Sequence, residues 1–119
     1  MPAAEVLDSH ALLTLLRDEP GAETVARILE RAGQRDQPVH MTEVNDAEVQ
    51  YMIRRKDGDD AWTVVAAGLN ALPIHSHPAD RRLADAFAAA LTREKQGRLI
   101  TGDPEFKPLE KEISITWLQ

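Results

Sequence analysis

Short apolar runs alternate with stretches of helical periodicity along most of this 119-residue chain. The strand-like runs are residues 3–7, 39–41, 72–75, 98–101 and 113–117. Between them, apolar residues recur at three- and four-residue spacing, as in Val25, Ile28, Leu29 and Ala32, which is typical of an amphipathic helix. Strands that alternate with helices predict an α/β domain with a mainly parallel sheet. In such a sheet, ligands bind beyond the carboxyl ends of the strands.

The length and composition narrow the class of protein further. The chain is long enough for one compact domain over residues 1–119, and 43% of its residues are apolar, so a core can form. The net charge of −6 argues against a nonspecific nucleic-acid coat protein, but it leaves a nuclease open. There is no cysteine, no signal-peptide pattern at the start and no apolar stretch long enough to span a bilayer. We therefore expect a cytoplasmic protein that does not enter a membrane.

Four acidic residues stand beside the predicted strands or open a helix. Asp8 follows the first strand, Glu43 follows the second, and Asp103 lies two residues beyond the fourth. Because carboxyl ends of parallel strands meet at one edge, we expect these three acids to lie at the same edge of the sheet. Asp85 differs, since it lies within a helix among small alanines. Neighbouring carboxylates repel each other unless a cation lies between them.

A divalent metal removes that repulsion, and hard oxygen ligands of this kind suit Mg²⁺ or Mn²⁺. The reaction that needs such a cluster is phosphodiester hydrolysis, in which metal activates water and stabilises developing charge. Ser9 and Thr101 carry hydroxyls that could orient the ligands or the water. Candidate phosphate contacts are the cationic residues Arg54, Arg55, Lys56, Arg81, Arg82 and Lys107.

Each of the strand-end acids also has a purely structural explanation. Asp8 can cap the following helix, Glu43 can complement the helix dipole, and Asp103 can form a turn before Pro104. Asp85 has no such role. The metal-site hypothesis therefore depends on the four acids taken together.

The segments that carry these acids resemble the PIN-domain family, and within it the VapC-type toxin ribonucleases of toxin–antitoxin pairs. The resembling segments are VLDSHALLTLL, MTEVNDAEV, LADAFAAAL and LITGDPEF, followed by the closing ISITWL strand. The resemblance implies a three-layer fold with a sheet of about five parallel strands. It also implies a metal-dependent endoribonuclease, commonly a homodimer, that a cognate antitoxin protein silences. The acidic positions of the family fall on Asp8, Glu43, Asp85 and Asp103.

The chain departs from the family pattern before Asp85. Members usually have a further helix there, whereas only Pro78 to Arg82 separate the third strand from the helix of Asp85. In the family's strand order this connection crosses about 14 Å, and five extended residues reach at most about 17 Å. Either the helix packs across the sheet with a distorted start, or the C-terminal part exchanges into the partner of a domain-swapped dimer.

Two other functions compete with the nuclease. A catalytically inactive PIN-like module, which has lost a helix and binds an antitoxin-like partner, is the first alternative. A phospho-accepting signalling domain is the second, but it needs an acidic pair after the first strand, where Asp8 stands alone.

The histidines give a weaker signal. His75 and His77 alternate on a strand and so share a face, which would suit zinc. With no cysteine and no third ligand evident, we do not predict a zinc site from the sequence. His40 is interpreted as a strand-end contact and His10 as a polar residue at a helix start.

Overall fold

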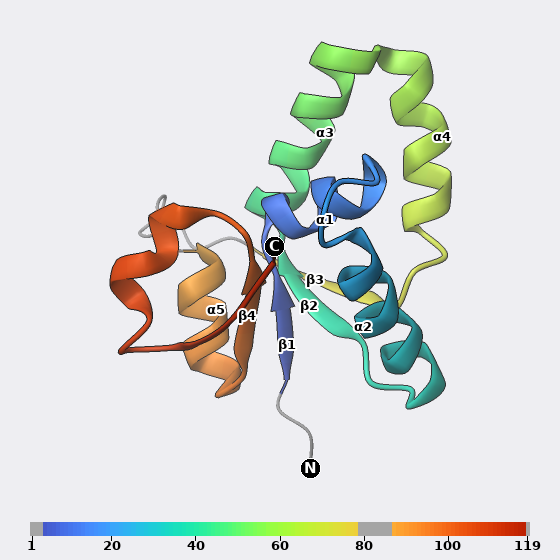
Figure 1. Cartoon of the computed structure of the whole chain (residues 1–119). Coiled ribbons are helices and arrows are strands. Elements are labelled where there is room, and N and C mark those ends of the chain that lie inside the picture. Colours follow the sequence, from blue (N-terminus) through green and yellow to red (C-terminus); the bar gives the residue numbers. More distant parts are fainter. Residues whose placement is uncertain (1–3, 79–86, 119) are drawn as a thin grey trace.

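A five-stranded parallel sheet forms the centre of the molecule (Figure 1). The computed structural model describes residues 4–78 and 87–118. The strands are β1 (Glu5–Leu7), β2 (Val39–Thr42), β3 (Ile74–His77), β4 (Arg98–Thr101) and β5 (Ser114–Trp117). Their order is β3-β2-β1-β4-β5, and the strand pairs are parallel. The predicted α/β class and the five-stranded sheet are confirmed.

Helices cover both faces of this sheet, so the fold has three layers (Figure 1). The helices are α1 (Ser9–Leu16), α2 (Ala22–Gln34), α3 (Glu43–Asp57), α4 (Asp59–Leu69), α5 (Phe87–Lys95) and the 3₁₀ helix η1 (Pro104–Leu109). Helices α1 and α2 pack on one face, and α5 packs on the other. Helices α3 and α4 form an antiparallel pair that extends beyond the carboxyl end of the sheet (Figure 1).

The alternation of side chains along each strand decides which helix it contacts. In β1, Leu7 packs against α2 through Val25 and Ile28, whereas its neighbour Val6 faces α5 and packs against Ala88. All of these side chains are buried. Burial of one such aliphatic side chain stabilises a fold by roughly 1.5–3 kcal/mol. The two faces of the sheet therefore anchor the helical layers separately.

Strand β3 begins two residues later than the sequence predicts. The Leu72 N–H bonds to the Leu69 carbonyl and continues the turn that ends α4, and Pro73 has no N–H to donate. The strand therefore starts at Ile74, and both His75 and His77 lie within it. His77, which lies beyond the end of the predicted strand, is therefore the last residue of β3.

The connection predicted to be short, Pro78 to Arg82, falls almost entirely outside the described residues. Residues 79–86 lie outside the described residues, and the predicted ligand Asp85 is among them. In the observed strand order, β2 and β1 lie between the edge strand β3 and β4. Strand β4 pairs with β1 of the same chain, which completes the sheet within one chain. In the described part of the chain, no helix has the length and apolar character needed to cross a membrane.

Candidate active site at the carboxyl edge of the sheet

Asp8 connects β1 to α1 and is almost entirely buried, with 3% of its surface exposed. Its extended backbone makes it the N-cap of α1, and its Oδ1 accepts a hydrogen bond of 2.8 Å from the Ala11 N–H. Its Oδ2 accepts a hydrogen bond from the Thr101 hydroxyl. The predicted capping role of Asp8 is therefore correct. Each carboxylate oxygen still has a lone pair for another ligand, since an ionised carboxylate accepts at about four positions.

Thr101 links Asp8 to Asp103. It ends β4, is fully buried, and its hydroxyl oxygen also accepts a 3.0 Å hydrogen bond from the Asp103 N–H. Asp103 in turn caps η1, and its Oδ1 accepts from the Glu105 N–H at 3.0 Å. The Thr101 hydroxyl thus orients the carboxylate of Asp8, which follows β1, and the backbone of Asp103, which follows β4. The role of Thr101 in orienting a metal ligand stays a prediction, with which these hydrogen bonds agree.

The environment of Asp8 disfavours its charged form. Burial raises the pKa of this carboxyl from 3.8 to about 6, and the nearby charge of Asp103 adds to the rise. Hydrogen bonds from Thr101 and Ala11 and the proximity of His10 lower the pKa and only partly offset burial. A cation beside Asp8 would relieve the same penalty, because it stabilises the ionised carboxylate.

Helix α3 brings three acids to the neighbouring strand end. Glu43 is its first residue and is exposed, and Asp46 is half-buried. Burial, and then the charge of Glu43, raise the pKa of Asp46. Of the three acids, only Glu43 was predicted from the sequence as a site residue.

A hydrogen-bonded chain fixes the third of these acids, Glu48. Thr42 ends β2 and caps α3 by accepting from the Asn45 N–H, and the Thr42 hydroxyl donates to the Asn45 side chain, both at 3.1 Å. The Asn45 amide then donates to Glu48 Oε1 at 2.8 Å. The three-residue spacing of Thr42, Asn45 and Glu48 is the sequence signal that could have identified this chain.

The ring of His10 also lies at this edge, which the sequence analysis did not anticipate. A Cβ atom on Gly102 would lie 2.5 Å from His10 Cε1 and 3.1 Å from its Nδ1. Only glycine therefore allows the ring to lie against the backbone between Thr101 and Asp103. His10 is the second residue of α1, as predicted, but it also forms part of the acidic site.

The structure brings together some of the predicted residues and not others. Asp8, Thr101 and Asp103 form a connected group, and Ser9 begins α1 beside them. Asp85 lies outside the described residues. The three described acids Asp8, Glu43 and Asp103 do not all come within the mutual 4.8 Å expected of atoms around one ion. Within residues 4–78 and 87–118, only His40, His75 and His77 do so.

A family comparison agrees with this fold. Residues 6–81, more than half of the chain, match the model of the PIN domain. The chain belongs to the PIN domain family. The matched residues include β1 to β3 and the acids Asp8, Glu43 and Glu48. Strand β4 lies outside the match, and its last residue, Thr101, hydrogen-bonds Asp8. A comparison with curated proteins finds no match.

PIN domains are generally nucleases that use divalent metal ions. The residues at this edge fit such an ion, because Asp8 retains acceptor positions beyond its two hydrogen bonds and Asp103 lies close enough to affect its pKa. An all-oxygen donor set of this kind is suited to Mg²⁺ or Mn²⁺.

Proposed function

We propose that this PIN domain is a metal-dependent endoribonuclease and the toxin of a toxin–antitoxin pair. The observation that carries the proposal is the link from Asp8 through Thr101 to Asp103 at the carboxyl edge of the sheet. In a parallel α/β sheet this edge is where ligands bind. The intact link favours a nuclease over an inactive PIN-like module.

Asp8 and Asp103 would hold Mg²⁺ or Mn²⁺, together with an acid from α3 and Asp85. The bound cation would supply a more acidic water and would stabilise charge that develops on the phosphate. Thr101 holds the Asp8 carboxylate in one orientation, and burial excludes water from around it. From α3, Glu43 is the candidate predicted from sequence, and Glu48 is a second candidate because Asn45 fixes its carboxylate.

A groove along α3 offers a path for the RNA. Its volume is about 960 Å³, and it runs from Val44, beside Glu43, to Lys56 at the end of the helix. Lining residues are Arg17, Val44, Ala47, Glu48, Tyr51, Met52, Arg55 and Lys56. The three cations can bind phosphates, whereas Glu48 belongs to the acidic end. We propose that the RNA backbone follows this groove toward the acids.

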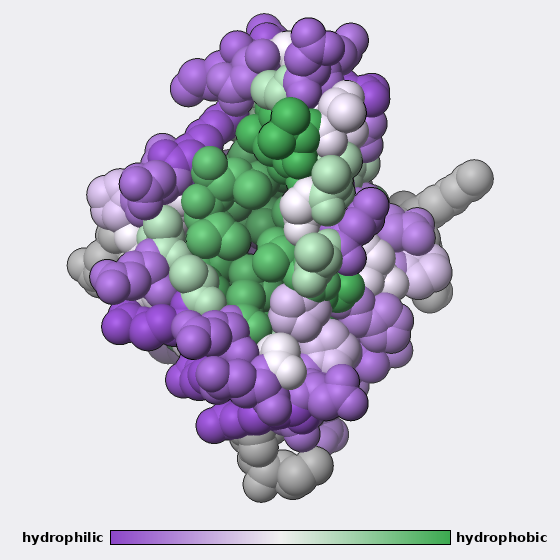
Figure 2. Space-filling model, turned by 90° about the vertical axis from the view of Figure 1, so that its right-hand side faces the viewer, coloured by the Kyte–Doolittle hydropathy of each residue, from purple (hydrophilic) through white to green (hydrophobic). Residues whose placement is uncertain are grey.

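A separate apolar groove offers a surface for the antitoxin. Its volume is about 580 Å³, and its apolar lining is Leu15, Ala26, Leu29, Leu72 and Pro73. Figure 2 shows hydrophobic residues gathered on the side of the molecule that carries α2 and α4. An apolar surface of this kind suits an amphipathic segment of a partner protein. We also propose that the protein forms a homodimer.

RNA cleavage by the purified protein tests this function. We expect cleavage that depends on Mn²⁺ or Mg²⁺, is lost with EDTA, and falls to background in Asp8→Asn and Asp103→Asn. Expression of the wild type alone should arrest growth, and the two variants should not. Cleavage that persists in both variants would show that the acids are not the active site.

A further inference from the structure

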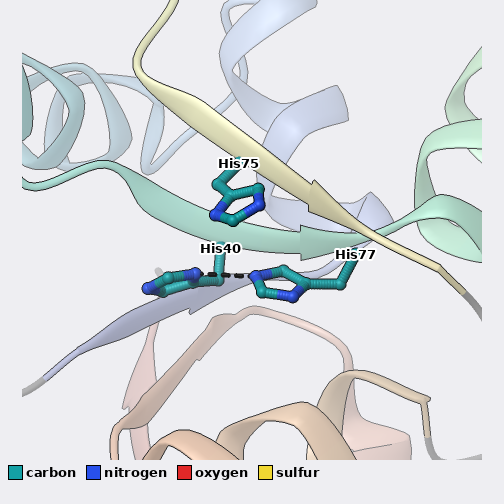
Figure 3. A group of neighbouring side chains, drawn as sticks. All are labelled: His40, His75 and His77. Atoms are coloured by element: carbon teal, nitrogen blue, oxygen red, sulfur yellow. Dashed lines mark hydrogen bonds between the residues drawn. The ribbon is translucent and has the colours of Figure 1, made fainter.

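Three histidines from two neighbouring strands meet on the face of the sheet that α5 covers. His40 comes from β2, and His75 and His77 come from β3 (Figure 3). One ring nitrogen from each lies within 4.8 Å of the other two. The centroids of the rings are 4.3–5.8 Å apart. In Figure 3 the rings of His40 and His77 point toward each other, and that of His75 lies beside them.

The register of the sheet creates this cluster. His40 pairs directly with His75, so their side chains leave the same face. His77 follows two residues later on β3 and therefore shares that face. His40 also lies opposite Val6 of β1, which packs against α5. Three imidazoles thus project from the same face of two paired strands.

We infer that His40, His75 and His77 form a binding site for a Zn²⁺ ion, which joins the edge strand β3 to β2. Imidazole nitrogen is a preferred ligand of zinc, and three histidines with an open fourth position are one of its known arrangements. Around tetrahedral zinc, with bonds of 2.0–2.1 Å, two nitrogens lie roughly 3.3 Å apart. The three nitrogens now lie within 4.8 Å of one another, and ion binding would draw them to that spacing.

Two nitrogens of the cluster are already closer than that spacing. His40 Nδ1 and His77 Nε2 share a hydrogen bond of 2.8 Å. For both nitrogens to bind one ion, the donor ring must move its proton to its other nitrogen, which neutral imidazole does by changing tautomer. The change of tautomer therefore frees both nitrogens to bind the ion.

The surroundings leave room for a fourth ligand. His75 is exposed, and His40 and His77 are half-exposed, so an ion and a water molecule can reach the rings. Glu94 and Lys95 of α5 bring one charge of each sign near His77. The charge of Lys95 opposes a cation, and its removal should therefore strengthen binding.

This site is separate from the proposed nuclease centre, since it contains none of the acids. Nitrogen ligands favour zinc, whereas the oxygen ligands at Asp8 and Asp103 favour Mg²⁺ or Mn²⁺. The two sites can consequently be tested independently. The double variant Asp8→Asn/Asp103→Asn removes the acidic site and should leave zinc binding intact.

Calorimetric titration of Zn²⁺ into that double variant, prepared without a histidine tag, tests the inference. We expect one saturable ion per chain, at least about a tenfold loss of affinity when His75→Ala is added, and a gain with Lys95→Gln. Because His75 is exposed, its replacement should not prevent folding. His10→Ala is the matched control, since it removes a histidine outside the cluster and should leave the affinity unchanged.

Two further readouts make the result decisive. Zn²⁺ should raise the Tm of the double variant but not that of the protein that also carries His75→Ala. Co²⁺ should give the intense visible absorption of a tetrahedral site. The inference is overturned if Zn²⁺ does not saturate, if His75→Ala binds as tightly as its parent, or if His10→Ala causes an equal loss.

Discussion

The Thr101 hydroxyl donates a hydrogen bond to the Asp8 carboxylate across the β1–β4 strand pair. Both side chains are buried, and 93 residues separate them in the sequence. This bond joins the first strand to the fourth at the proposed metal site. The bond forms only when β1 and β4 are paired, so it depends on correct folding of the sheet. Variants at either residue therefore test how stability and metal binding are connected.

Replacement of Asp8 by Asn should stabilise the metal-free protein at neutral pH. The native pKa of about 6 lies above the ordinary value of 3.8, so the native state holds the proton more tightly than the unfolded chain does. This contribution is fully present below about pH 4 and is lost as the pH rises through 6. The shift corresponds to on the order of 3 kcal/mol at pH 7.

Denaturant unfolding in EDTA at several pH values measures this effect. Asp8→Asn should unfold at higher denaturant concentration than the wild type at pH 7–8, and the gap should close near pH 4. An Asp8→Asn protein that is less stable than the wild type at pH 8 would show that burial of the ionised Asp8 carboxylate does not destabilise the native state.

Thr101→Val should weaken the site while the core keeps its shape. Valine retains the volume but not the hydroxyl, so Asp8 loses a hydrogen bond worth about 1.5–3 kcal/mol, and its pKa should rise further. We expect a loss of Mn²⁺ affinity of about 10–100-fold, which is typical for a residue that orients a metal ligand. Thr101→Ser keeps the hydroxyl and should retain most of the affinity. Equal losses in both variants would instead indicate a packing defect.

Gly102→Ala should push the His10 ring away from the acidic edge. The new Cβ would lie 2.5 Å from His10 Cε1, and we expect a destabilisation of about 1–3 kcal/mol. His10→Ala removes the clash, so the double variant should be more stable than the sum of the two single effects predicts. The free energies of unfolding of the four proteins measure this coupling, and simple additivity would argue against the contact.

Glu48→Gln should reduce metal-dependent cleavage more than Glu43→Gln does. Both acids are exposed, but the Thr42–Asn45 chain holds the Glu48 carboxylate in place, and Glu48 lines the groove along α3. We expect a loss of at least about tenfold in kcat/KM for Glu48→Gln, comparable with the removal of a well-positioned ligand. A greater loss in Glu43→Gln would identify Glu43 as the acid that α3 supplies.

Local patterns were sufficient to predict much of the fold and to place Asp8 and Thr101 at the carboxyl edge of the sheet. Asp8 could be found because one residue both ends a strand and caps a helix, and Thr101 because it ends an apolar run. Glu48 was not named as a candidate because its side-chain position depends on which face of α3 turns toward the strand ends. The hydrogen bond from Asn45 then fixes the Glu48 carboxylate.

The histidine cluster could not be predicted for a different reason. The HxH pattern was visible, but its third member, His40, depends on the register between β2 and β3. In a parallel sheet, register is set by packing of both faces and not by a turn between the strands. His40 was expected to make a strand-end contact, and it does contact His77 at the end of β3, but its place beside His75 was not predicted.

Calorimetric titration of Mn²⁺ into the untagged protein tests the central claim most directly, because it asks whether Asp8 and Asp103 hold a metal. The wild type and the His75→Ala variant should both bind Mn²⁺ saturably, and Asp8→Asn and Asp103→Asn should each lose that binding while remaining folded. Saturable Mn²⁺ binding that survives in both aspartate variants, or no saturable binding in the wild type, would contradict the account.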